Sequence, residues 1–360
     1  MSRILEGYAL DGSGPRTSLR LASLYVDQFP QNDISRAMAK KHGVPLADSI
    51  EGALTLGTGK LAVDGVLIVA EHGSYPLSVT EQTVYPKRRM FTEVVKVFEK
   101  SGRVVPVFSD KHLADNWTDA KWIYDKAREL NIPLMAGSSV PSYRRLPEAN
   151  VARGRPLKEI VATAYGPVEA YGFHVLELLQ CLAERRRGDE TGVRRVQFLA
   201  GQRLWDAARD NVFDVQLLNA ALARGIPDFD PTQEWREKVK EPAAFVVDYN
   251  DGLRASVFLL SRLTEEFSAA WRYADDGQVE ATRFALQNER PYTHFAFLLQ
   301  GIERMMQSGE PSWPAERTLM TTGMLHAAMQ SKLRQGVPVA TPHLAIRYHS
   351  DWEWMQPPAP

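Results

Sequence analysis

Short apolar runs separated by amphipathic segments dominate the middle of the first half of the chain. The apolar runs are nearly continuous and are typical of buried strands; they span residues 63–70, 104–108 and 133–137. The segment from Phe91 to Phe98 places its apolar residues on one face at helical spacing. This alternation predicts a parallel sheet covered by helices on both faces, with ligands at the carboxyl ends of its strands.

The residues before these runs predict another strand and two helices. Leu19 to Tyr25 is typical of a buried strand and leads into Asp27. A helix is predicted from Ile34 to His42, because Gly43 stands at the position that caps a helix C-terminus. A shorter helix is predicted from Ile50 to Leu56.

The pattern changes after Pro141, and we place a domain boundary between residues 1–141 and 142–360. Residues 142–155 are loop-like, and residues 203–224 are predicted to be helical. The strongest hairpin signal is Asn250-Asp251-Gly252 between two apolar strands. Hairpins combined with helices predict an α+β domain with a large, mostly antiparallel sheet. The predicted strands are 157–165, 193–199, 244–249, 253–260, 269–273 and 279–285, and the predicted helices are 171–185, 295–306 and 315–333.

Composition and charge exclude several classes of function. The chain of 360 residues has a net charge of -1, so no global field favours nucleic acid or an anionic membrane. It shows neither a signal-peptide pattern nor an apolar run long enough to span a bilayer, which predicts a cytoplasmic protein. The single cysteine, Cys181, lies in the apolar register of a predicted helix, so we expect a buried thiol rather than a nucleophile.

Acidic, basic and histidine side chains follow two of the predicted parallel strands. Glu71-His72 follows the first strand, and Asp110-Lys111-His112 follows the second. Both segments are therefore expected at the edge of the sheet where ligands bind. Histidine and carboxylate are also common metal ligands, but no His-x-x-x-His or comparable spacing accompanies them, so no metal is expected.

Asp27 is a candidate residue for binding a dinucleotide cofactor. An acidic residue at the end of an early strand holds ribose hydroxyls in dinucleotide-binding folds, although aspartate also forms turns and caps helices. No strand followed by G-x-G-x-x-G precedes Leu19, and Gly12-Ser13-Gly14-Pro15 is predicted to be a turn. The run Lys87-Arg88-Arg89 is predicted to be a solvated charge run at a helix start, with contact to an acidic partner or a phosphate as the alternative.

The order of these features resembles the Gfo/Idh/MocA family of sugar oxidoreductases over nearly the whole chain after Leu19. In the first domain the resemblance rests on the strand ending in Asp27 and on four motifs: Lys40-Lys41-His42-Gly43-Val44-Pro45, Val63-Asp64-Gly65-Val66, Asp110-Lys111-His112 in place of the family's Glu-Lys-Pro, and Pro133-Leu134-Met135-Ala136-Gly137. In the second domain, Gly172-Phe173-His174-Val175-Leu176-Glu177 resembles the family's Gly-x-His-x-x-Asp. The helix at 295–308 and the one ending in Met329-Gln330-Ser331 resemble its C-terminal pattern. The resemblance implies an α/β protein in which a Rossmann-like domain precedes the α+β domain.

The resemblance also implies roles for individual residues. Lys111 would lie beside the nicotinamide and the substrate hydroxyl, where a cation favours the alkoxide-like charge that develops during hydride transfer. His174 would be the general acid/base, since its unperturbed pKa near neutrality suits proton transfer. The remaining expected site residues are Asp27, Glu71, His72 and Asp110 for the cofactor, and His112, Arg144 and Tyr171 for the substrate.

The sequence departs from the family pattern at three points. The glycine fingerprint and its strand are absent, His112 replaces a proline, and Ala170 stands where the family often has an acidic residue. The opening residues resemble the end of a first helix, so we expect that the natural start lies upstream of Met1. The alternative is that this branch of the family no longer binds the cofactor in the usual way.

These observations predict an NAD(P)-dependent oxidoreductase that transfers a hydride to or from a sugar-like polyol or keto-sugar. Asp27 favours NAD over NADP, because a carboxylate repels a 2′-phosphate. The family's exposed C-terminal sheet implies a homo-oligomer, a dimer or tetramer. The tail from Pro342 to Pro360 is predicted to pack back on the body of the protein, including the first domain, or on a partner subunit.

Two other functions remain open at this point. A non-redox lyase or epimerase on the same scaffold would abstract a proton from a sugar, with or without a divalent metal; its candidate residues are Glu71, His72, Asp110, His112 and His174. A catalytically silent binding or assembly protein would instead use the sheet of the second domain.

Overall fold

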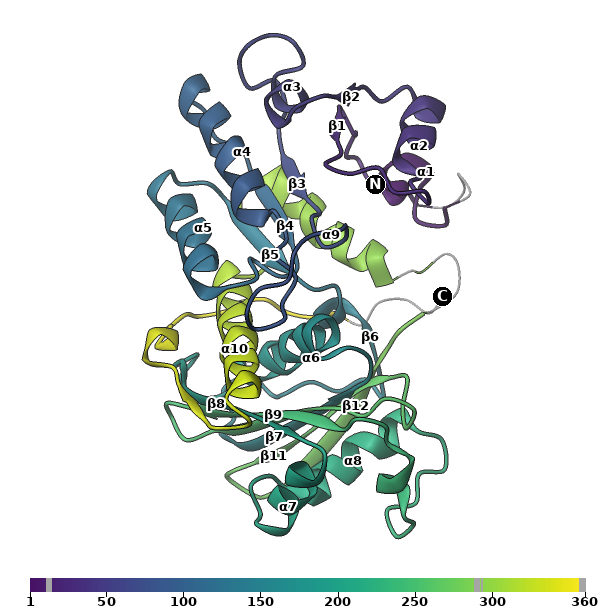
Figure 1. Ribbon diagram of the computed structural model, residues 1–360, viewed down its shortest axis with the longest axis vertical. Helices are drawn as coiled ribbons and strands as arrows, with labels where there is room; N and C mark the ends of the chain where they lie inside the picture. The colour runs from purple at the N-terminus through teal and green to yellow at the C-terminus, as the bar shows by residue number, and fades with distance from the viewer. Residues whose placement is uncertain (11–14, 288–291, 293, 356–360) are drawn as a thin grey trace. The chain divides into compact units, whose positions relative to one another are not determined.

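The computed structural model of the chain describes residues 1–10, 15–287, 292 and 294–355. The chain forms two compact units. Unit 1 comprises residues 1–76, 83–137 and 287–315, and unit 2 comprises residues 77–82, 138–286 and 316–360. The α/β class predicted from the sequence is confirmed, with a parallel sheet in unit 1 and a large, mostly antiparallel sheet in unit 2 (Figure 1). The turn predicted at Gly12 to Gly14 and the last five residues of the tail lie outside the described residues.

The sheet of unit 1 consists of three parallel strands, as the apolar runs predict. They are β3 (Val66–Ile68), β4 (Val107–Asp110) and β5 (Leu134–Gly137), paired in that order. The helices α4 (Lys87–Ser101) and α5 (Trp117–Glu129) connect them. The apolar face predicted for α4 is buried, with no more than 4% of Phe91, Val94, Val95 or Phe98 exposed. Because the strands are parallel, their carboxyl ends meet at one edge of the sheet.

The N-terminal part of unit 1 forms a second, smaller sheet. Its strands are β1 (Leu24–Tyr25) and β2 (Leu46–Ala47), which pair in parallel. The prediction of a strand from Leu19 is wrong for residues 19–23, since strand β1 finds a partner only along the two residues of β2. The surrounding helices are α1 (Ser2–Glu6), α2 (Ser35–His42) and α3 (Ile50–Thr55).

Helix α9 (His294–Ser308) also belongs to unit 1, although the chain reaches it only after the large sheet. Its Met306 side chain lies against Gly65, where an added Cβ atom would clash with the Met306 sulfur. Just beyond the helix, the Trp313 indole Nε1 donates a hydrogen bond to the Ala136 carbonyl at 2.8 Å. These contacts hold a C-terminal segment against the parallel sheet.

Unit 2 contains an eight-stranded sheet in the order β13-β8-β9-β10-β7-β11-β12-β6. All neighbours are antiparallel except β10 and β7, and the predicted hairpin forms β9 and β10. The loop predicted at 142–155 is wrong in part, because residues 144–146 find backbone partners in β12 and form β6. The strands are β6 (Arg144–Leu146), β7 (Leu157–Ala164), β8 (Val193–Ala200), β9 (Ala243–Tyr249), β10 (Arg254–Leu259), β11 (Phe267–Tyr273), β12 (Val279–Ala285) and β13 (Val339–Ala340).

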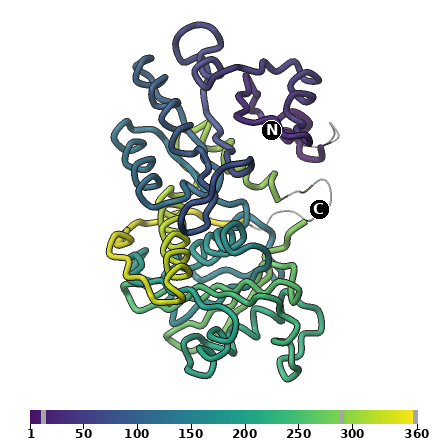
Figure 2. Tube along the Cα trace, in the orientation of Figure 1, coloured from purple at the N-terminus to yellow at the C-terminus, as the bar shows by residue number. Residues whose placement is uncertain are grey.

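Helices cover both faces of this sheet (Figures 1 and 2). Helix α6 (Val168–Ala183) packs on one face, with α10 (Ala315–Leu333) beside it. Helices α7 (Gln202–Arg209) and α8 (Val215–Gly225) pack on the other, where a core joins them to β7–β12. The resemblance implied that this second face is exposed, and that implication is wrong for this chain. The single helical stretch predicted at 203–224 is also wrong, because the Asp214 side chain caps a new helix by accepting from the Gln216 and Leu217 amides.

The C-terminal tail packs on unit 2. The Trp354 indole donates to the Tyr143 carbonyl at 2.9 Å. The Glu353 carboxylate pairs with Arg153 at 2.7 Å and with Arg185 at 2.9 Å. Within the described ranges, no helix is both long enough and apolar enough to cross a membrane.

Candidate functional site

An acidic and a basic side chain form a shielded ion pair at the carboxyl edge of the parallel sheet. Glu71 follows β3, and Lys111 follows β4. The Lys111 Nζ lies 2.9 Å from Glu71 Oε2, and only 10% and 17% of the two side chains are exposed. The Asp110 carboxyl, at the end of β4, forms a hydrogen bond with Glu71. The sheet therefore brings together three of the residues that the sequence singled out.

The two histidines of these segments lie in different surroundings. His72 is largely exposed, with its ring 3.6 Å from Glu71 Oε1. His112 directly follows Lys111 in the sequence, and it is only 2% exposed. Its burial makes His112 the better placed of the two to shape the site, while His72 faces solvent.

Burial and pairing shift the pKa values of the two carboxyl groups at this edge in opposite directions. Burial by itself would raise the pKa of Glu71, but the Lys111 ammonium and the hydrogen bond from Asp110 outweigh it and lower that pKa to about 2. Burial, and next the negative charge of Glu71, raise the pKa of Asp110 to about 8. At neutral pH the edge therefore holds one carboxylate and one protonated carboxyl that donates to it.

The prediction of a solvated charge run at the start of α4 is wrong for Lys87, whereas Arg89 is exposed and Arg88 is partly exposed, as predicted. Lys87 is only 2% exposed, and its Nζ donates to the backbone carbonyls of Asp110 and Lys111. Arg88 pairs with Asp119 at 2.7 Å and stacks over the Trp122 ring. All three cations of the run, Arg89 included, are engaged within unit 1.

Asp27, the predicted ribose ligand, lies in a hydrogen-bonded cluster beyond β1. Its carboxylate accepts from the Tyr25 and Tyr75 hydroxyls, both at 2.8 Å, and from Arg89 at 2.6 Å. Burial opposes ionisation here, but these three donors outweigh it and lower the pKa of Asp27. The adjacent Gln28 exchanges two hydrogen bonds with the backbone of Ser74. The loop after β3 is thus tied to the end of β1.

In unit 2, His174 lies on α6 beside a serine that follows β5. Its Nδ1 and the Ser138 Oγ are 2.6 Å apart, and the Val140 amide donates to the same hydroxyl. The Ser138 amide in turn donates to the buried Glu177, one turn along the helix, at 3.4 Å. Ser138 thus connects the two polar residues of the Gly-x-His-x-x-Glu segment and fixes the orientation of the imidazole.

Aromatic rings surround His174. The Tyr171 ring meets the imidazole edge-on at 5.9 Å and is parallel to the Phe267 ring at 6.1 Å. Tyr165 lies 4.9 Å from Tyr171, and burial is the main cause that raises the pKa of Tyr165. Tyr171, a predicted substrate contact, therefore belongs to the surroundings of His174. Arg144, another predicted substrate contact, lies in the edge strand β6 opposite Ala285.

No protein family model matches the sequence, and no curated protein matches it. Solved structures do resemble the fold. GenD2 from gentamicin A biosynthesis, in complex with NAD, is 13% identical with a TM-score of 0.54, and the match covers 85% of each chain. Myo-inositol dehydrogenase from Lactobacillus casei, in complex with NAD(H) and myo-inositol, is 11% identical with a TM-score of 0.51 and the same coverage. An oxidoreductase from Agrobacterium radiobacter, in complex with NAD⁺, L-tartaric acid and magnesium, is 14% identical with a TM-score of 0.50, and the match covers 85% of this chain and 87% of that one.

The chain has the Gfo/Idh/MocA-type dehydrogenase fold. At this level of identity the likeness establishes the fold, and the roles of individual residues remain to be argued from their surroundings. Within this fold, Lys111 follows β4 and His174 lies on α6.

Several residues of these clusters escaped the sequence analysis. Ser138 directly follows β5, so the rule that ligands meet the carboxyl ends of parallel strands offered a signal for it. Lys87 gave no signal, because it stands in a run of three basic residues and only the fold buries it. Tyr75 and Arg89 likewise meet Asp27 only through the tertiary structure.

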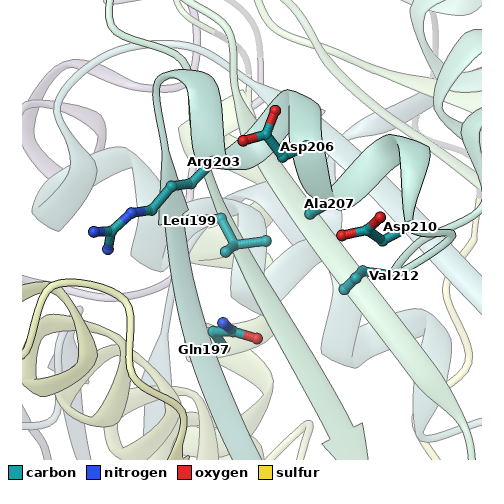
Figure 3. Close-up of a pocket in the computed structure, with 7 residues that line it drawn as sticks. All are labelled: Gln197, Leu199, Arg203, Asp206, Ala207, Asp210 and Val212. Atoms are coloured by element: carbon teal, nitrogen blue, oxygen red, sulfur yellow. The ribbon is translucent and has the colours of Figure 1, made fainter.

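A cavity among the described residues lies well away in sequence from these clusters. It lies between β8 and α7, has a volume of about 240 Å³, and is lined by Gln197, Leu199, Arg203, Asp206, Ala207, Asp210 and Val212 (Figure 3). None of the predicted site residues lines it. In the part of the chain that the structure describes, no group of three or more His, Cys, Asp or Glu side chains is arranged to hold a metal.

Proposed function

We propose that the protein is a nicotinamide-dependent oxidoreductase that transfers a hydride to or from a hydroxyl or keto group of a sugar-like polyol. The observation that carries this proposal is the shielded Lys111–Glu71 pair at the carboxyl edge of the parallel sheet. The fold likeness supports it, since relatives in fold were solved with NAD and with myo-inositol.

The residues at this edge suit a nicotinamide nucleotide. Asp27 would hold the ribose of the adenosine, and Lys111 would lie beside the nicotinamide, with Glu71, His72 and Asp110 around it. The bound cofactor supplies the hydride-accepting and hydride-donating ring. Because Arg89 pairs with Asp27 at 2.6 Å, this carboxylate no longer argues against a 2′-phosphate, and NADP is as well suited to the site as NAD.

Lys111 is the residue proposed to act on the substrate oxygen. Its ammonium is held by Glu71, whose lowered pKa keeps that carboxylate ionised at neutral pH. A fixed cation stabilises negative charge that develops on an oxygen during the reaction, and it does so most strongly where water is excluded. His174 is proposed to move the proton, with its ring oriented by Ser138. His112, Arg144 and Tyr171 are proposed to contact the substrate.

Two measurements test the proposal in sequence. NADH and NADPH are first titrated against the protein while nicotinamide fluorescence is followed, and saturable binding is expected for at least one. Turnover is then measured on a panel of polyols that includes myo-inositol. Lys111→Met is expected to lower kcat about 100-fold, because the cation that stabilises the developing charge is lost.

The matched control is Lys121→Met, which removes an exposed lysine of α5 that pairs with Asp125 on the same helix. It is expected to leave kcat unchanged. Full turnover by Lys111→Met would refute the mechanism. If neither nucleotide binds and no polyol turns over, the catalytically silent binding or assembly protein becomes the better description.

One observation favours a second function, a non-redox lyase or epimerase. The Glu71 and Asp110 carboxyls share a hydrogen bond, and their pKa values lie far apart, at about 2 and about 8. Two carboxyl groups separated in this way are typical of acid–base catalysis. This function predicts turnover of a sugar without added nicotinamide and its loss in Asp110→Asn, whereas an oxidoreductase requires the cofactor.

A further inference from the structure

Lys87 is a buried ammonium group that contacts the backbone of the proposed site. It lies in the first turn of α4 and is 2% exposed. Its Nζ donates to the carbonyl oxygen of Asp110 and, at 3.1 Å, to that of Lys111. Removing an ammonium from water is costly unless hydrogen bonds and opposite charges offset it, so an apolar residue would be the ordinary choice at such a position.

The two carbonyls that Lys87 contacts flank a single residue. The Asp110 carbonyl belongs to the peptide group before the Lys111 Cα, and the Lys111 carbonyl belongs to the peptide group after it. One ammonium therefore fixes both peptide planes around this Cα. Because those planes set the direction of the Cα–Cβ bond, they also set the direction of the Lys111 side chain.

Lys87 also interacts electrostatically with the charged groups at this edge. The acids are Glu71, which follows β3, and Asp110, the last residue of β4. The cations are Lys111, which follows β4, and Lys87 in the first turn of α4. Burial lowers the pKa of Lys87 to about 8, and the negative charges of Asp110, when it is ionised, and of Glu71 oppose that change. At neutral pH the ammonium form therefore predominates and is electrostatically coupled to the Lys111–Glu71 pair.

We propose that Lys87 is the positioning residue of the site, which holds the backbone around Lys111 so that its amine stays on Glu71 and points at the reacting oxygen. The first part stands on the contacts alone. The second part, that the Lys111 amine points at a reacting oxygen, rests on the proposed function. The two parts therefore need separate readouts.

The first readout uses no substrate. The full-length protein is acetylated with trace acetic anhydride at pH 7.5, and labelling of Lys111 is measured by mass spectrometry relative to the exposed Lys121. In Lys87→Met the peptide planes are released and the ion pair opens more often, so labelling is expected to rise about fivefold or more. If that variant does not fold, Lys87→Gln removes the charge and shortens the reach, and the same rise is expected.

A matched destabilised variant separates positioning from a general loss of stability. Val95→Ala truncates a side chain of α4 that is 4% exposed and belongs to the buried face of the helix. It is expected to lower Tm while it leaves relative labelling of Lys111 within about twofold of wild type. If the folded Lys87 variant labels Lys111 no faster than Val95→Ala does, the positioning role is wrong, whether or not the protein is a dehydrogenase.

The second readout uses turnover. Lys87→Met is expected to lower kcat about tenfold while KM for the nicotinamide nucleotide stays within about threefold. The reason is that Lys87 affects the orientation of the Lys111 side chain rather than the binding of the nucleotide. Val95→Ala is expected to change neither. Faster labelling without a loss of kcat would overturn the catalytic part and keep the backbone contact. If wild type has no turnover, the proposed function fails, and labelling alone decides the positioning role.

Discussion

Glu71 and Asp110 show how strongly position decides the behaviour of a carboxyl group. Glu71 follows β3 and Asp110 ends β4 in the same parallel sheet, and both are largely buried. Glu71 receives the Lys111 ammonium directly, whereas Asp110 faces the negative charge of Glu71. A direct ion pair outweighs the cost of burial for the first group, and a like charge adds to that cost for the second.

The raised pKa of Asp110 predicts a pH dependence of stability. Between the unfolded value near 4 and the folded value of about 8, the folded state holds a proton that the unfolded state has lost. The contribution of Asp110 to stability therefore falls as pH rises through this window and is constant above it. Asp110→Asn removes this slope, so its stability relative to wild type is expected to increase by more than about 1 kcal/mol between pH 5 and pH 8.

Urea unfolding of both proteins at a series of pH values measures this difference. Asp125→Asn, at an exposed position of α5, is the control for the loss of a carboxyl group. A constant difference between Asp110→Asn and wild type across the whole series would show that Asp110 does not titrate in this window.

At the scale of elements, α7 and α8 set this chain apart from what its resemblance implied. A sheet with one exposed face needs a partner surface or solvent-compatible side chains on that face. Here the outward face carries Val161, Val246 and Phe258, and the two helices bury them. Two helices of the same chain thus cover the apolar face through which the resemblance implied assembly.

The packing of α8 predicts a large effect of truncation on that face. Leu218 is 1% exposed and belongs to the core between the helix and the sheet. Leu218→Ala is expected to lower the free energy of unfolding by about 2–5 kcal/mol, because it leaves a cavity that the sheet cannot fill. The same substitution at Leu333, which is 60% exposed at the end of α10, is expected to change it by less than about 0.5 kcal/mol.

Urea or thermal unfolding compares the two leucine variants directly. Equal, small losses would mean that α8 does not pack on the sheet as described. Light scattering on the same samples measures the mass in solution and tests the homo-oligomer that the family resemblance predicts.

At the scale of the whole molecule, the C-terminal tail completes the polar interior of unit 2. Glu184 and Arg317, both 1% exposed as side chains, form an ion pair there. Ser350 and Tyr348 of the tail each donate a hydrogen bond of 2.8 Å to the same Glu184. Tyr348 also accepts from Gln180 at 2.9 Å. The tail therefore supplies partners that a buried charged group needs.

Removal of the tail is expected to destabilise the protein far more than its length suggests. Deletion after Ala340 takes away these three hydrogen bonds together with other contacts of the tail, and each loss at a buried group costs about 1–3 kcal/mol, so a total of at least about 3 kcal/mol is expected. Deletion after Met355 retains these contacts and is the control. Thermal unfolding of both truncations checks the difference, and equal Tm values would contradict the structural role of the tail.

The sequence by itself determined much of the fold. Periodicity located β3, β4 and β5 and the buried face of α4, and the Asn-Asp-Gly turn located the β9–β10 hairpin, since these signals depend on residues close together in the chain. It also indicated that Glu71, Asp110 and Lys111 follow parallel strands, and therefore that they meet at one edge.

Only the tertiary structure decided which charges meet and which surfaces are buried. No local pattern distinguishes Lys87 from Arg88, yet the fold buries the first against two carbonyls and leaves the second on the helix surface. Likewise, Asp27 and Arg89 are 62 residues apart. The cover of the large sheet by α7 and α8 depends on contacts with strands β7 to β12, which no window of sequence contains. Burial and electrostatics are properties of the neighbours that folding brings together, so the strands follow from the sequence, while the chemistry of the site follows from their packing.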